Sequence, residues 1–219
     1  MRPRLLDLFC CEGGAAVGYH RAGFDIVGID RDGKFAKRYP FEFHQADAIE
    51  FIREHGHEFD AIHASPPCQA YSGTQKIQNN DHPDLIGPTR DALEATGVPY
   101  VIENVPGAPL LDPALLCGAM FGLETYRHRL FESSVVIETP PHPEHVAPLT
   151  KMGRPPKPGE FMHIVGNFSG VDRGREVMEM PWASRDGLRE AIPPAYTTWV
   201  GLALRVALDE METQLEAAS

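Results

Sequence analysis

Short apolar runs alternate with polar, glycine-containing stretches along the first half of the chain. The runs predict five strands, at residues 5–9, 25–30, 41–45, 59–64 and 98–102. Helices are expected beside them, at residues 15–22, 33–39, 48–54 and 89–96. Strands that alternate with helices are typical of an α/β protein with a mostly parallel sheet. The pattern therefore predicts an α/β fold in which helices flank the sheet.

The second half of the chain is less regular. Seven prolines between residues 139 and 159 exclude regular structure there, because proline fixes φ and lacks an N–H donor. Beyond this stretch we expect a strand at 161–166, a short packed helix around 177–182 and a long amphipathic helix at 197–215.

Polar residues and glycines gather where the predicted strands end. The glycine turn at 10–14 precedes a helix and fits a nucleotide cradle, because glycine lets a ligand approach the backbone at a helix N-terminus. A purely structural turn explains it equally well. Asp30 ends the second strand, where an acid binds ribose hydroxyls or caps the next helix. Asp47 is placed to cap the following helix, which the local pattern favours, or to reach the base of a ligand.

The fourth strand leads into a rigid turn that carries a cysteine. Pro66 and Pro67 stiffen the chain directly before Cys68. A thiol fixed at the end of a strand is where an α/β enzyme places a nucleophile, although free cysteine is also often a small buried hydrophobe. Residues 70–90 are polar and rich in Asn, Asp, Gly and Pro, which favours a mobile lid.

Glu103 closes the fifth predicted strand. Because the carboxyl ends of parallel strands share one edge of a sheet, we expect Glu103 to lie beside Cys68 as its acid partner. A helix cap or an ion pair in a turn would also explain this carboxylate. Arg127 and Arg129 are spaced to share one face of a strand, where they bind phosphate or a carbonyl group, or form a solvated edge.

The formal charge of −11 argues against non-specific binding to nucleic acid. Residues 127–175 differ, because seven basic residues against five acidic ones give this stretch +2 and leave −13 for the remainder. A polyanion is therefore expected to meet this stretch first. Its proline-rich part contains Arg154 and Lys157, which suit a nucleic-acid groove or, alternatively, an exposed linker.

The cysteines and the apolar content exclude several classes of protein. The four cysteines, at 10, 11, 68 and 117, form no Cys-x-x-Cys pair, so we expect neither a disulfide framework nor a metal site. Apolar runs fall short of the roughly 20 residues of a membrane span. The N-terminal run is too short for a signal-peptide core. A cytoplasmic location without a membrane partner is the expectation.

Taken in order, several short motifs resemble those of the DNA (cytosine-5)-methyltransferases. Residues 7–14 resemble the family's cofactor loop, residues 66–69 its PCQ nucleophile motif, and residues 103–105 its ENV motif. Residues 125–129 fall on QxRxR, and residues 191–194 on a late motif that folds back beside the cofactor loop. The resemblance covers roughly the first 131 residues and the last 30 or so. It implies the Rossmann-like, S-adenosylmethionine-dependent methyltransferase fold.

The resemblance also implies a division of the chain and a cofactor site. Residues 1–131 form a catalytic and cofactor-binding domain, residues 132–188 a reduced target-recognition segment, and residues 189–219 a C-terminal turn and helix. S-adenosylmethionine is the implied cofactor, without a metal. The residues implied to bind it are Phe9, Cys10, Cys11, Gly13, Gly14, Asp30, Asp47, Pro66, Ala191 and Ile192.

For catalysis, the resemblance implies covalent chemistry on a cytosine that has been flipped out of the DNA. The Cys68 thiolate adds to carbon 6, Glu103 holds ring nitrogen 3, and Arg127 binds the base carbonyl, with Arg129 in the same motif. Carbon 5 then takes the methyl group, and loss of its proton expels Cys68. The residues implied to position or contact the substrate are Pro67, Ser72, Asn104, Arg154 and Lys157.

The sequence departs from the family pattern at four positions. Cys11 and Glu12 replace a glycine and an alanine, Thr125 replaces the glutamine, and Glu190 stands where asparagine is usual. The short recognition segment keeps other substrates in play, namely RNA and a free cytidine nucleotide. A non-catalytic binding protein, or a monomeric catalytic chain that relies on a recognition or restriction partner, are further alternatives.

Overall fold

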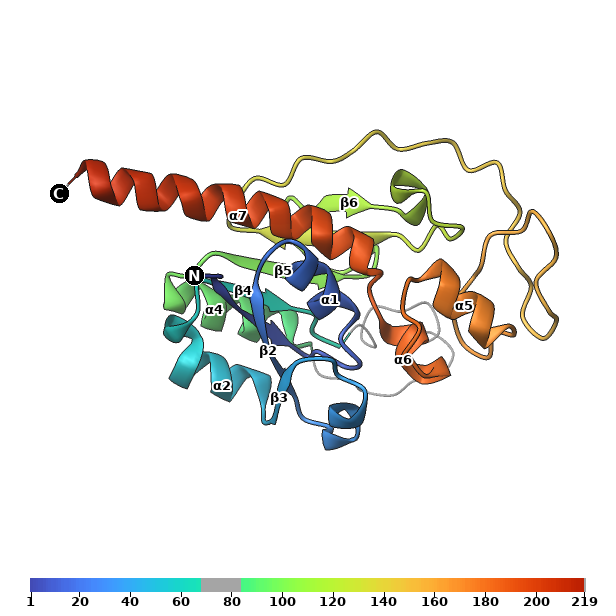
Figure 1. The fold of residues 1–219 in the computed structure, drawn as a ribbon, viewed down its shortest axis with the longest axis horizontal. Coiled ribbons are helices and arrows are strands. Elements are labelled where there is room, and N and C mark those ends of the chain that lie inside the picture. The colour runs from blue at the N-terminus through green and yellow to red at the C-terminus, as the bar shows by residue number, and fades with distance from the viewer. Residues whose placement is uncertain (68–83, 219) are drawn as a thin grey trace.

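The computed structural model describes residues 1–67 and 84–218, so the predicted nucleophile Cys68, the predicted DNA contact Ser72 and most of the predicted lid lie outside the described residues. Within the described part, seven strands form one sheet in the order β3-β2-β1-β4-β5-β7-β6 (Figure 1). The strands are β1 (Arg4–Leu8), β2 (Asp25–Asp30), β3 (Glu42–Gln45), β4 (Ala61–Ala64), β5 (Tyr100–Asn104), β6 (Ala114–Leu116) and β7 (Arg129–Ser133). β1 to β5 are parallel and β7 runs antiparallel to β5 and β6, which confirms the predicted fold class.

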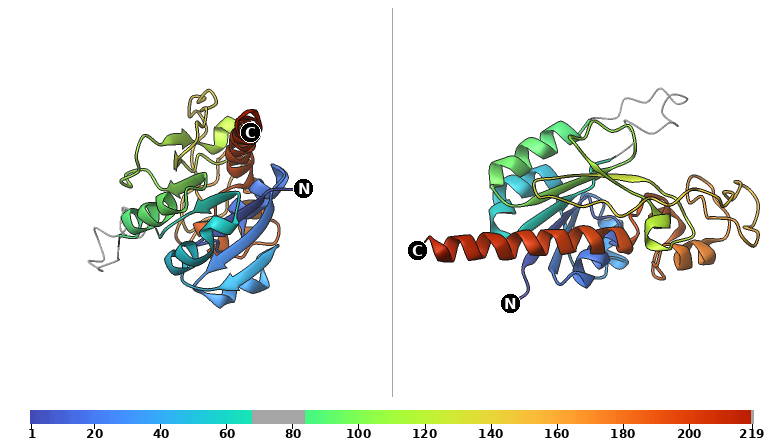
Figure 2. Two further views of the ribbon diagram at one scale, coloured as in Figure 1. Left: turned by 90° about the vertical axis from the view of Figure 1, so that its left-hand side faces the viewer. Right: turned by 90° about the horizontal axis from the view of Figure 1, so that it is seen from above.

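Helices cover both faces of the sheet. α1 (Gly14–Arg21) and α7 (Pro194–Ala217) pack against each other on one face, whereas α2 (Ala48–His55) and α4 (Ile86–Thr96) cover the other (Figures 1 and 2). Short 3₁₀ helices join the strands, at η1 (Gly33–Lys37), η2 (Gly56–Glu58) and η4 (Gly118–Phe121). Because both faces are buried, the strands read as apolar runs with little alternation.

Residues 132–188, the predicted recognition segment, supply all but one residue of a small second core. After β7 the chain runs extended into α5 (Val171–Val177) and α6 (Arg185–Glu190), which stand beyond the carboxyl ends of the parallel strands (Figure 1). Nine buried residues form this core: Met162, Ile164, Phe168, Val177, Met178, Met180, Ala183, Leu188 and Ala191. The expected strand at 161–166 is wrong, since Phe161 makes only an isolated bridge to Leu149.

Two helices in the last third of the chain differ from the sequence-based expectation. The helix expected around 177–182 is wrong, because α5 ends at Val177 and the chain turns there. α7 begins three residues earlier than expected, at Pro194, since proline is well suited to the first helical position. The first half of α7 packs on α1, and its second half projects past the body (Figure 2). Of the described helices, none is both long and apolar enough to cross a membrane.

Candidate active site

A cavity of about 690 Å³ opens at the carboxyl edge of the parallel strands. The loop after β1, the ends of β2, β4 and β5, and the turn before α7 surround it. Thirteen predicted site residues line it: Phe9, Cys10, Cys11, Gly14, Asp30, Asp47, Pro66, Pro67, Glu103, Asn104, Arg129, Ala191 and Ile192. Gly13, Arg127, Arg154 and Lys157 are not part of this lining.

Asp30 ties together the two loops that form one wall of the cavity. Its Oδ2 accepts the backbone N–H of Cys11 at 3.1 Å, and its Oδ1 accepts that of Asp32 at 2.9 Å. Burial raises the pKa of Asp30, and these two hydrogen bonds oppose that shift. The alternative role as a helix cap is wrong, because Asp32 accepts the N–H of Lys34 and caps η1.

Asp47 behaves as the helix cap that the sequence favoured. Its Oδ1 accepts the backbone N–H groups of Ile49 and Glu50 at 3.0 and 3.1 Å, which satisfies two of the free donors at the start of α2. The side chain also borders the cavity. A capping role therefore holds Asp47 at the cavity wall.

The glycines of the first loop are required by packing within the protein. A Cβ on Gly14 would lie 2.4 Å from the carbonyl oxygen of Ile192, and one on Gly13 would lie 2.7 Å from Cδ of Pro40. Gly13 also has a φ of +81°, which glycine adopts without strain. The turn at 191–193 consequently lies directly against the loop and closes the cavity beside it.

Three of the four departures from the family pattern make structural contacts around this loop. Glu12 is buried, and its carboxylate accepts the backbone N–H and the hydroxyl of Ser184 at 2.7 and 2.6 Å. The thiol of Cys11 donates to Glu190 at 3.7 Å, so these two departures contact each other. Sequence reasoning missed these roles. The substitutions themselves were the signal, since they join the loop to the recognition segment and to α6.

Asp7 borders the cavity but was not among the site residues predicted from the sequence. It is buried, and Tyr39 donates its hydroxyl to Oδ2 at 3.0 Å. Within the described residues Oδ1 has no hydrogen-bond partner, although Asp7 borders the cavity. Burial raises the pKa of Asp7 to about 7. An orphaned carboxylate oxygen at a cavity wall fits a ligand that brings a donor or a positive charge. A polar residue inside an apolar strand was the available signal.

Glu103 and Arg129 form the charged pair of the cavity. Glu103 closes β5 and is 5% exposed, and Nε of Arg129 at the start of β7 lies 2.9 Å from its Oε1. Oε1 accepts no aligned hydrogen bond from the described part of the chain, so the contact is an ion pair. Burial raises the pKa of Glu103, and the nearby Arg129 opposes the shift.

A buried chain of hydrogen bonds supports Glu103 from behind. Ser65 is bonded to the Glu103 carboxylate, and Nε2 of His63 lies 2.8 Å from its hydroxyl oxygen. The hydroxyl of Tyr19 lies 2.9 Å from Nδ1 of His63. Burial lowers the pKa of His63 to about 3, so the imidazole is neutral. The bonds then run in one direction, from Tyr19 O–H to His63, from His63 N–H to Ser65, and from Ser65 O–H to Glu103.

Asn104 fixes the proline turn that leads to Cys68. Its Nδ2 donates to the carbonyl oxygen of Pro66 at 2.9 Å, and its Oδ1 accepts the N–H of Val105. Asn104, the last residue of β5, therefore holds the turn at Pro66 that follows β4. Burial raises the pKa of the Cys10 and Cys11 thiols, which remain protonated and unreactive in the cavity wall.

Arg127 does not share a strand face with Arg129, which corrects the sequence-based expectation. β7 begins at Arg129, and Arg127 has a φ of +23° in the turn before it. Its guanidinium donates to three backbone carbonyls, those of Ile164 at 2.9 Å, Arg189 at 2.6 Å and Ala191 at 2.9 Å. Arg127 thus joins the recognition segment to the turn before α7.

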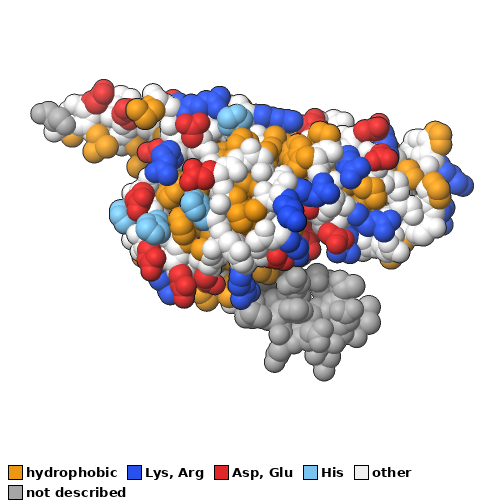
Figure 3. All heavy atoms as spheres, turned by 60° about the horizontal axis from the view of Figure 1, so that its bottom comes forward, with side chains coloured by type: hydrophobic (Ala, Val, Ile, Leu, Met, Phe, Trp, Pro, Cys, Tyr) orange, Lys and Arg blue, Asp and Glu red, His pale blue; other side chains and the backbone are white. Residues whose placement is uncertain are grey.

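The two predicted DNA contacts lie in a local loop of the recognition segment. Arg154 forms an ion pair with Glu160, and the backbone N–H of Lys157 donates to the same carboxylate. Arg173 and Arg175 are also paired with acidic residues. On the face shown in Figure 3, basic side chains gather toward the recognition segment with acidic ones among them. The positive charge expected from the sequence is therefore largely compensated locally.

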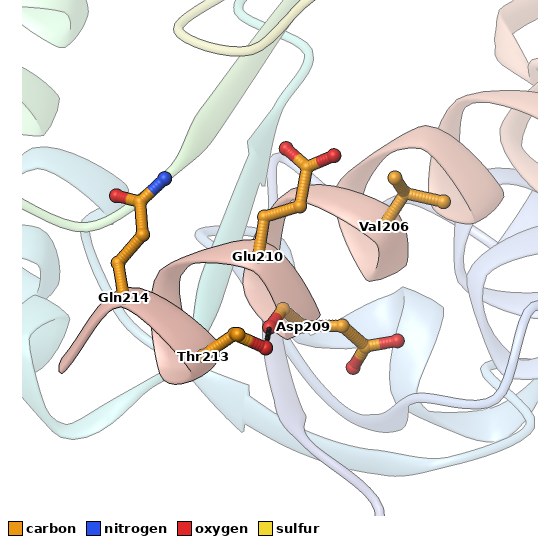
Figure 4. A pocket seen from close by; sticks show the side chains of 5 residues that line it. All are labelled: Val206, Asp209, Glu210, Thr213 and Gln214. Atoms are coloured by element: carbon orange, nitrogen blue, oxygen red, sulfur yellow. Dashed lines mark hydrogen bonds between the residues drawn. The ribbon is translucent and has the colours of Figure 1, made fainter. Parts of the chain in front are cut away.

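A second depression, of about 390 Å³, lies along the projecting half of α7 (Figure 4). Its lining residues all belong to this one helix: Val206, Asp209, Glu210, Thr213 and Gln214. The hydroxyl of Thr213 donates to the carbonyl of Asp209 four residues earlier, which is an ordinary helix contact. It lacks the convergent polar groups from several elements that distinguish the cavity at the sheet edge.

Comparisons with known proteins identify the first half of the chain. Residues 3–110 match the sequence model of the C-5 cytosine-specific DNA methylase family. The Type II methyltransferase M.FnuDI of Fusobacterium nucleatum is 29% identical over 85 residues, which are 36% of this chain and 25% of that protein. A relative from Oceanobacillus iheyensis, named as a type II methyltransferase, is 31% identical over 135 residues, 48% of this chain and 29% of its own length. The matches thus span less than a third of these curated relatives.

The fold as a whole is similar to that of solved methyltransferases. A prophage-encoded E. coli protein named as a DNA modification methyltransferase superposes with a TM-score of 0.68. The two chains share 14% identity, and the match covers 94% of this chain and 99% of that one. This likeness shows a shared fold, and the sequence match adds the family. The sequence match places residues 3–110 of the chain in the C-5 cytosine-specific DNA methylase family.

Proposed function

We propose that this protein transfers a methyl group from S-adenosylmethionine to carbon 5 of a cytosine in DNA, through a covalent adduct with Cys68. The observation that carries the proposal is the buried pair of Glu103 and Arg129. It borders the large cavity beside the proline turn that Asn104 holds, and Cys68 is the residue that follows this turn. A carboxyl group, a cation and a thiol are thereby assigned to one edge of the sheet.

The cofactor half of the cavity fits S-adenosylmethionine. The loop at 9–14, Asp30 and the turn at 191–192 form its wall, and the unpartnered Oδ1 of Asp7 offers an acceptor to a cationic or donor group. When bound, the cofactor supplies an electrophilic methyl group. The carboxylate of Asp30, already oriented by two backbone N–H groups, would accept ribose hydroxyls with its remaining lone pairs.

In the base half of the cavity, the chain's own residues activate the ring. The Cys68 thiolate forms a bond to carbon 6, and protonated Glu103 donates a hydrogen bond to nitrogen 3, which takes up the displaced electron pair. Carbon 5 then forms a bond to the methyl group, whose bond to the cofactor's sulfur would break to leave a neutral thioether. Its proton leaves to a base, the electron pair restores the 5,6 double bond, and the bond between sulfur and carbon 6 breaks. The thiolate is regenerated.

Burial raises the pKa of Glu103 and so favours the protonated form that this role requires, whereas the ion pair with Arg129 opposes the shift. Ser65 donates a hydrogen bond to the carboxyl group and so helps to fix its orientation. Arg129 contacts this carboxyl group directly. We assign it the role of binding the base and of holding Glu103 in place. Arg127 holds backbone carbonyls, and we assign it a positioning role.

DNA is the substrate that the family favours, and the paired charges of the recognition segment bear on how it is bound. The net charge is −11, and Arg154, Arg173 and Arg175 are all engaged with carboxylates. Weak intrinsic binding with a shallow dependence on salt is therefore expected, because both the affinity and the salt dependence grow with the number of phosphate contacts. A recognition partner would supply the contacts that this segment lacks.

Methyl transfer from labelled S-adenosylmethionine tests the proposal, with duplex DNA, single-stranded DNA, RNA and dCMP assayed in parallel. We expect incorporation into DNA by the wild type, and loss with Cys68→Ser while cofactor binding is retained. Glu94→Gln, an exposed change on α4, is the matched control and should remain active. Incorporation into RNA or dCMP but not DNA would overturn the choice of substrate, and full activity of Cys68→Ser would overturn the nucleophile.

A further inference from the structure

Four side chains that bind metals converge at a place separate from the cavity. Cys117 follows β6, His128 immediately precedes β7, and His142 and His145 come from the extended part of the recognition segment. One potential ligand atom of each lies within 4.8 Å of the other three. None of the four lines the cavity at the sheet edge. Their convergence therefore needs an explanation other than catalysis of methyl transfer.

Two of the distances between these atoms are close to those of tetrahedral coordination, and the most widely separated pair would draw together around an ion. Sγ of Cys117 lies 3.4 Å from Nε2 of His145, and Nε2 of His128 lies 3.2 Å from Nε2 of His142. Ligands held at about 2.0–2.3 Å from a tetrahedral zinc ion lie roughly 3.3–3.8 Å from one another. The rings of His128 and His142 face each other through their Nε2 atoms. A hydrogen bond between them requires that one of these two nitrogens carry a proton, whereas a shared metal ion would bind the lone pairs of both.

The groups around the four side chains prepare them to bind a metal. Sγ of Cys117 accepts the backbone N–H groups of Ala119 and Met120, which hold the sulfur in position. Nδ1 of His142 lies 2.9 Å from the carbonyl oxygen of Pro143, so its proton is held there and Nε2 is left with a lone pair. Such outer hydrogen bonds are the usual companions of metal ligands.

His145 is held in place by packing. Its ring stacks on Tyr126 with centroids 3.6 Å apart and an angle of 15° between the planes. The Tyr126 hydroxyl both donates to the carbonyl of Ala147 and accepts the N–H of Ala147, each at 2.9 Å. These contacts fix the two residues on either side of Val146, so the orientation of the imidazole is set before any metal binds.

We propose that Cys117, His128, His142 and His145 form a structural zinc site. One thiolate and three imidazoles are a tetrahedral donor set of the kind that zinc prefers, whereas calcium and magnesium require oxygen ligands. With four protein ligands the site is closed and leaves no position for a substrate. On binding, each imidazole contributes the lone pair of a neutral nitrogen, and the thiol releases its proton to solvent.

The site would fasten the recognition segment to the catalytic domain. His142 and His145 lie in an irregular, exposed stretch that has few other anchors to the sheet. His128 lies between Arg127, which joins the segments, and Arg129, which contacts Glu103. Zinc would therefore hold the arginine turn and the extended stretch in one arrangement. The inference does not depend on the proposed methyl transfer, because metal binding is measured without a substrate.

Metal content of the full chain tests the proposal. Protein purified in the presence of zinc and dialysed without chelator should contain about one equivalent of zinc by elemental analysis. Protein loaded with cobalt instead should show absorption typical of a tetrahedral ion bonded to a thiolate. His142→Ala and Cys117→Ser should lose the zinc, and His57→Ala, which changes an exposed histidine in η2, should retain it.

Circular dichroism distinguishes loss of a ligand from loss of the fold, since His142 is exposed and its removal leaves the sheet intact. Wild-type protein that remains free of zinc after equilibration with zinc ions would overturn the proposal. Zinc bound equally by wild type, His142→Ala and Cys117→Ser would overturn it too, because the metal would then sit elsewhere. A cobalt form without thiolate absorption would exclude Cys117 as a ligand and contradict the site as proposed.

Discussion

The cavity at the sheet edge and the cluster of Cys117 with three histidines lie on either side of one short turn, yet they are built differently. Arg127, His128 and Arg129 are consecutive, and their side chains enter three environments: backbone carbonyls, the histidine cluster and the Glu103 carboxyl group. The cavity is framed by the ends of parallel strands, and its groups are buried. The cluster is partly exposed, and two of its members, His142 and His145, lie in a stretch of the chain without regular secondary structure.

The contrast shows two ways to hold chemical groups together. A sheet edge places strand ends side by side whatever their side chains do, so Glu103 stays where β5 ends even when its charge is changed. The cluster lacks such a frame, and its geometry has to come from the contacts of the cluster itself or from a bound ion. The cavity should therefore be sensitive in its chemistry and robust in its structure, and the cluster should show the opposite behaviour.

Glu103→Gln gives the largest expected change. The amide cannot supply the proton that nitrogen 3 requires, and general acid contributions of this kind are worth about 10²–10⁴ in rate. We expect kcat to fall by that factor while the fold is kept, with a loss of unfolding free energy in urea because the buried Arg129 loses its charged partner. If kcat were retained while the unfolding free energy fell, the buried pair with Arg129 would have a structural role instead of a catalytic one.

Chelation should have the reverse effect on the cluster. At free zinc about 100-fold above Kd, the bound ion stabilises the folded state by about 2.7 kcal/mol, and a chelator removes this contribution. Thermal unfolding with and without chelator measures it. Cys117→Ser should unfold at the same temperature under both conditions, and His57→Ala should respond as the wild type does. A wild type whose Tm ignores the chelator would contradict the contrast.

The buried chain behind Glu103 predicts a specific dependence of stability on pH. The pKa of His63 is about 3 in the folded protein, against an ordinary value of 6.5, because the ring is buried. Between these values the unfolded chain binds one more proton, so stability is lost as the pH falls below about 6.5, by about 1.4 kcal/mol per pH unit.

The measurement is the difference in unfolding free energy between wild type and His63→Gln, from about pH 7 to about pH 4. This difference should fall by about 1.4 kcal/mol per pH unit, since glutamine does not titrate. The wild type alone is a poor readout. Asp7, whose pKa is raised to about 7, keeps its proton in the folded state and so loses stability as the pH rises, in the opposite sense. A difference that stays constant with pH would mean that His63 is not buried and neutral.

Glu12→Gln should give the smallest effect. It weakens the charged hydrogen bonds to Ser184 and removes one of them, at a cost of about 1–2 kcal/mol in unfolding free energy. Urea denaturation measures this, with the exposed Glu210→Gln on α7 as the control. If Glu12→Gln were as stable as the wild type, packing and the hydrogen bond from Trp182 to the backbone carbonyl of Glu12 would be enough to hold the first loop to the recognition segment.

Much of the cavity followed from the sequence, because strand order and strand ends follow from the alternation of apolar runs and turns. Glu103, Asn104 and Asp30 close strands and were placed at one edge on that ground. Asp47 was expected to cap a helix and does so. Predictions of this kind depend only on local pattern and on the geometry common to parallel sheets.

The rest could not be predicted, because it depends on contacts between distant segments. Nothing local indicates that Arg127 leaves the strand to bind carbonyls of residues 164, 189 and 191. The absence of a Cys-x-x-Cys pair argued against a metal site, whereas the structure brings Cys117 to residues 11 to 28 positions further along. The closely spaced His142 and His145 were the available signal, and proline-rich surroundings concealed it.

The most direct test of the central claim is covalent trapping with an oligonucleotide in which 5-fluorocytosine replaces the target base. Fluorine at carbon 5 cannot leave as a proton does, so the adduct persists after methyl transfer. Mass spectrometry of the digested complex should find the methylated base attached to the peptide that contains Cys68, only when S-adenosylmethionine is present. An adduct of equal yield with Cys68→Ser, or attachment at Cys10, Cys11 or Cys117, would contradict the account.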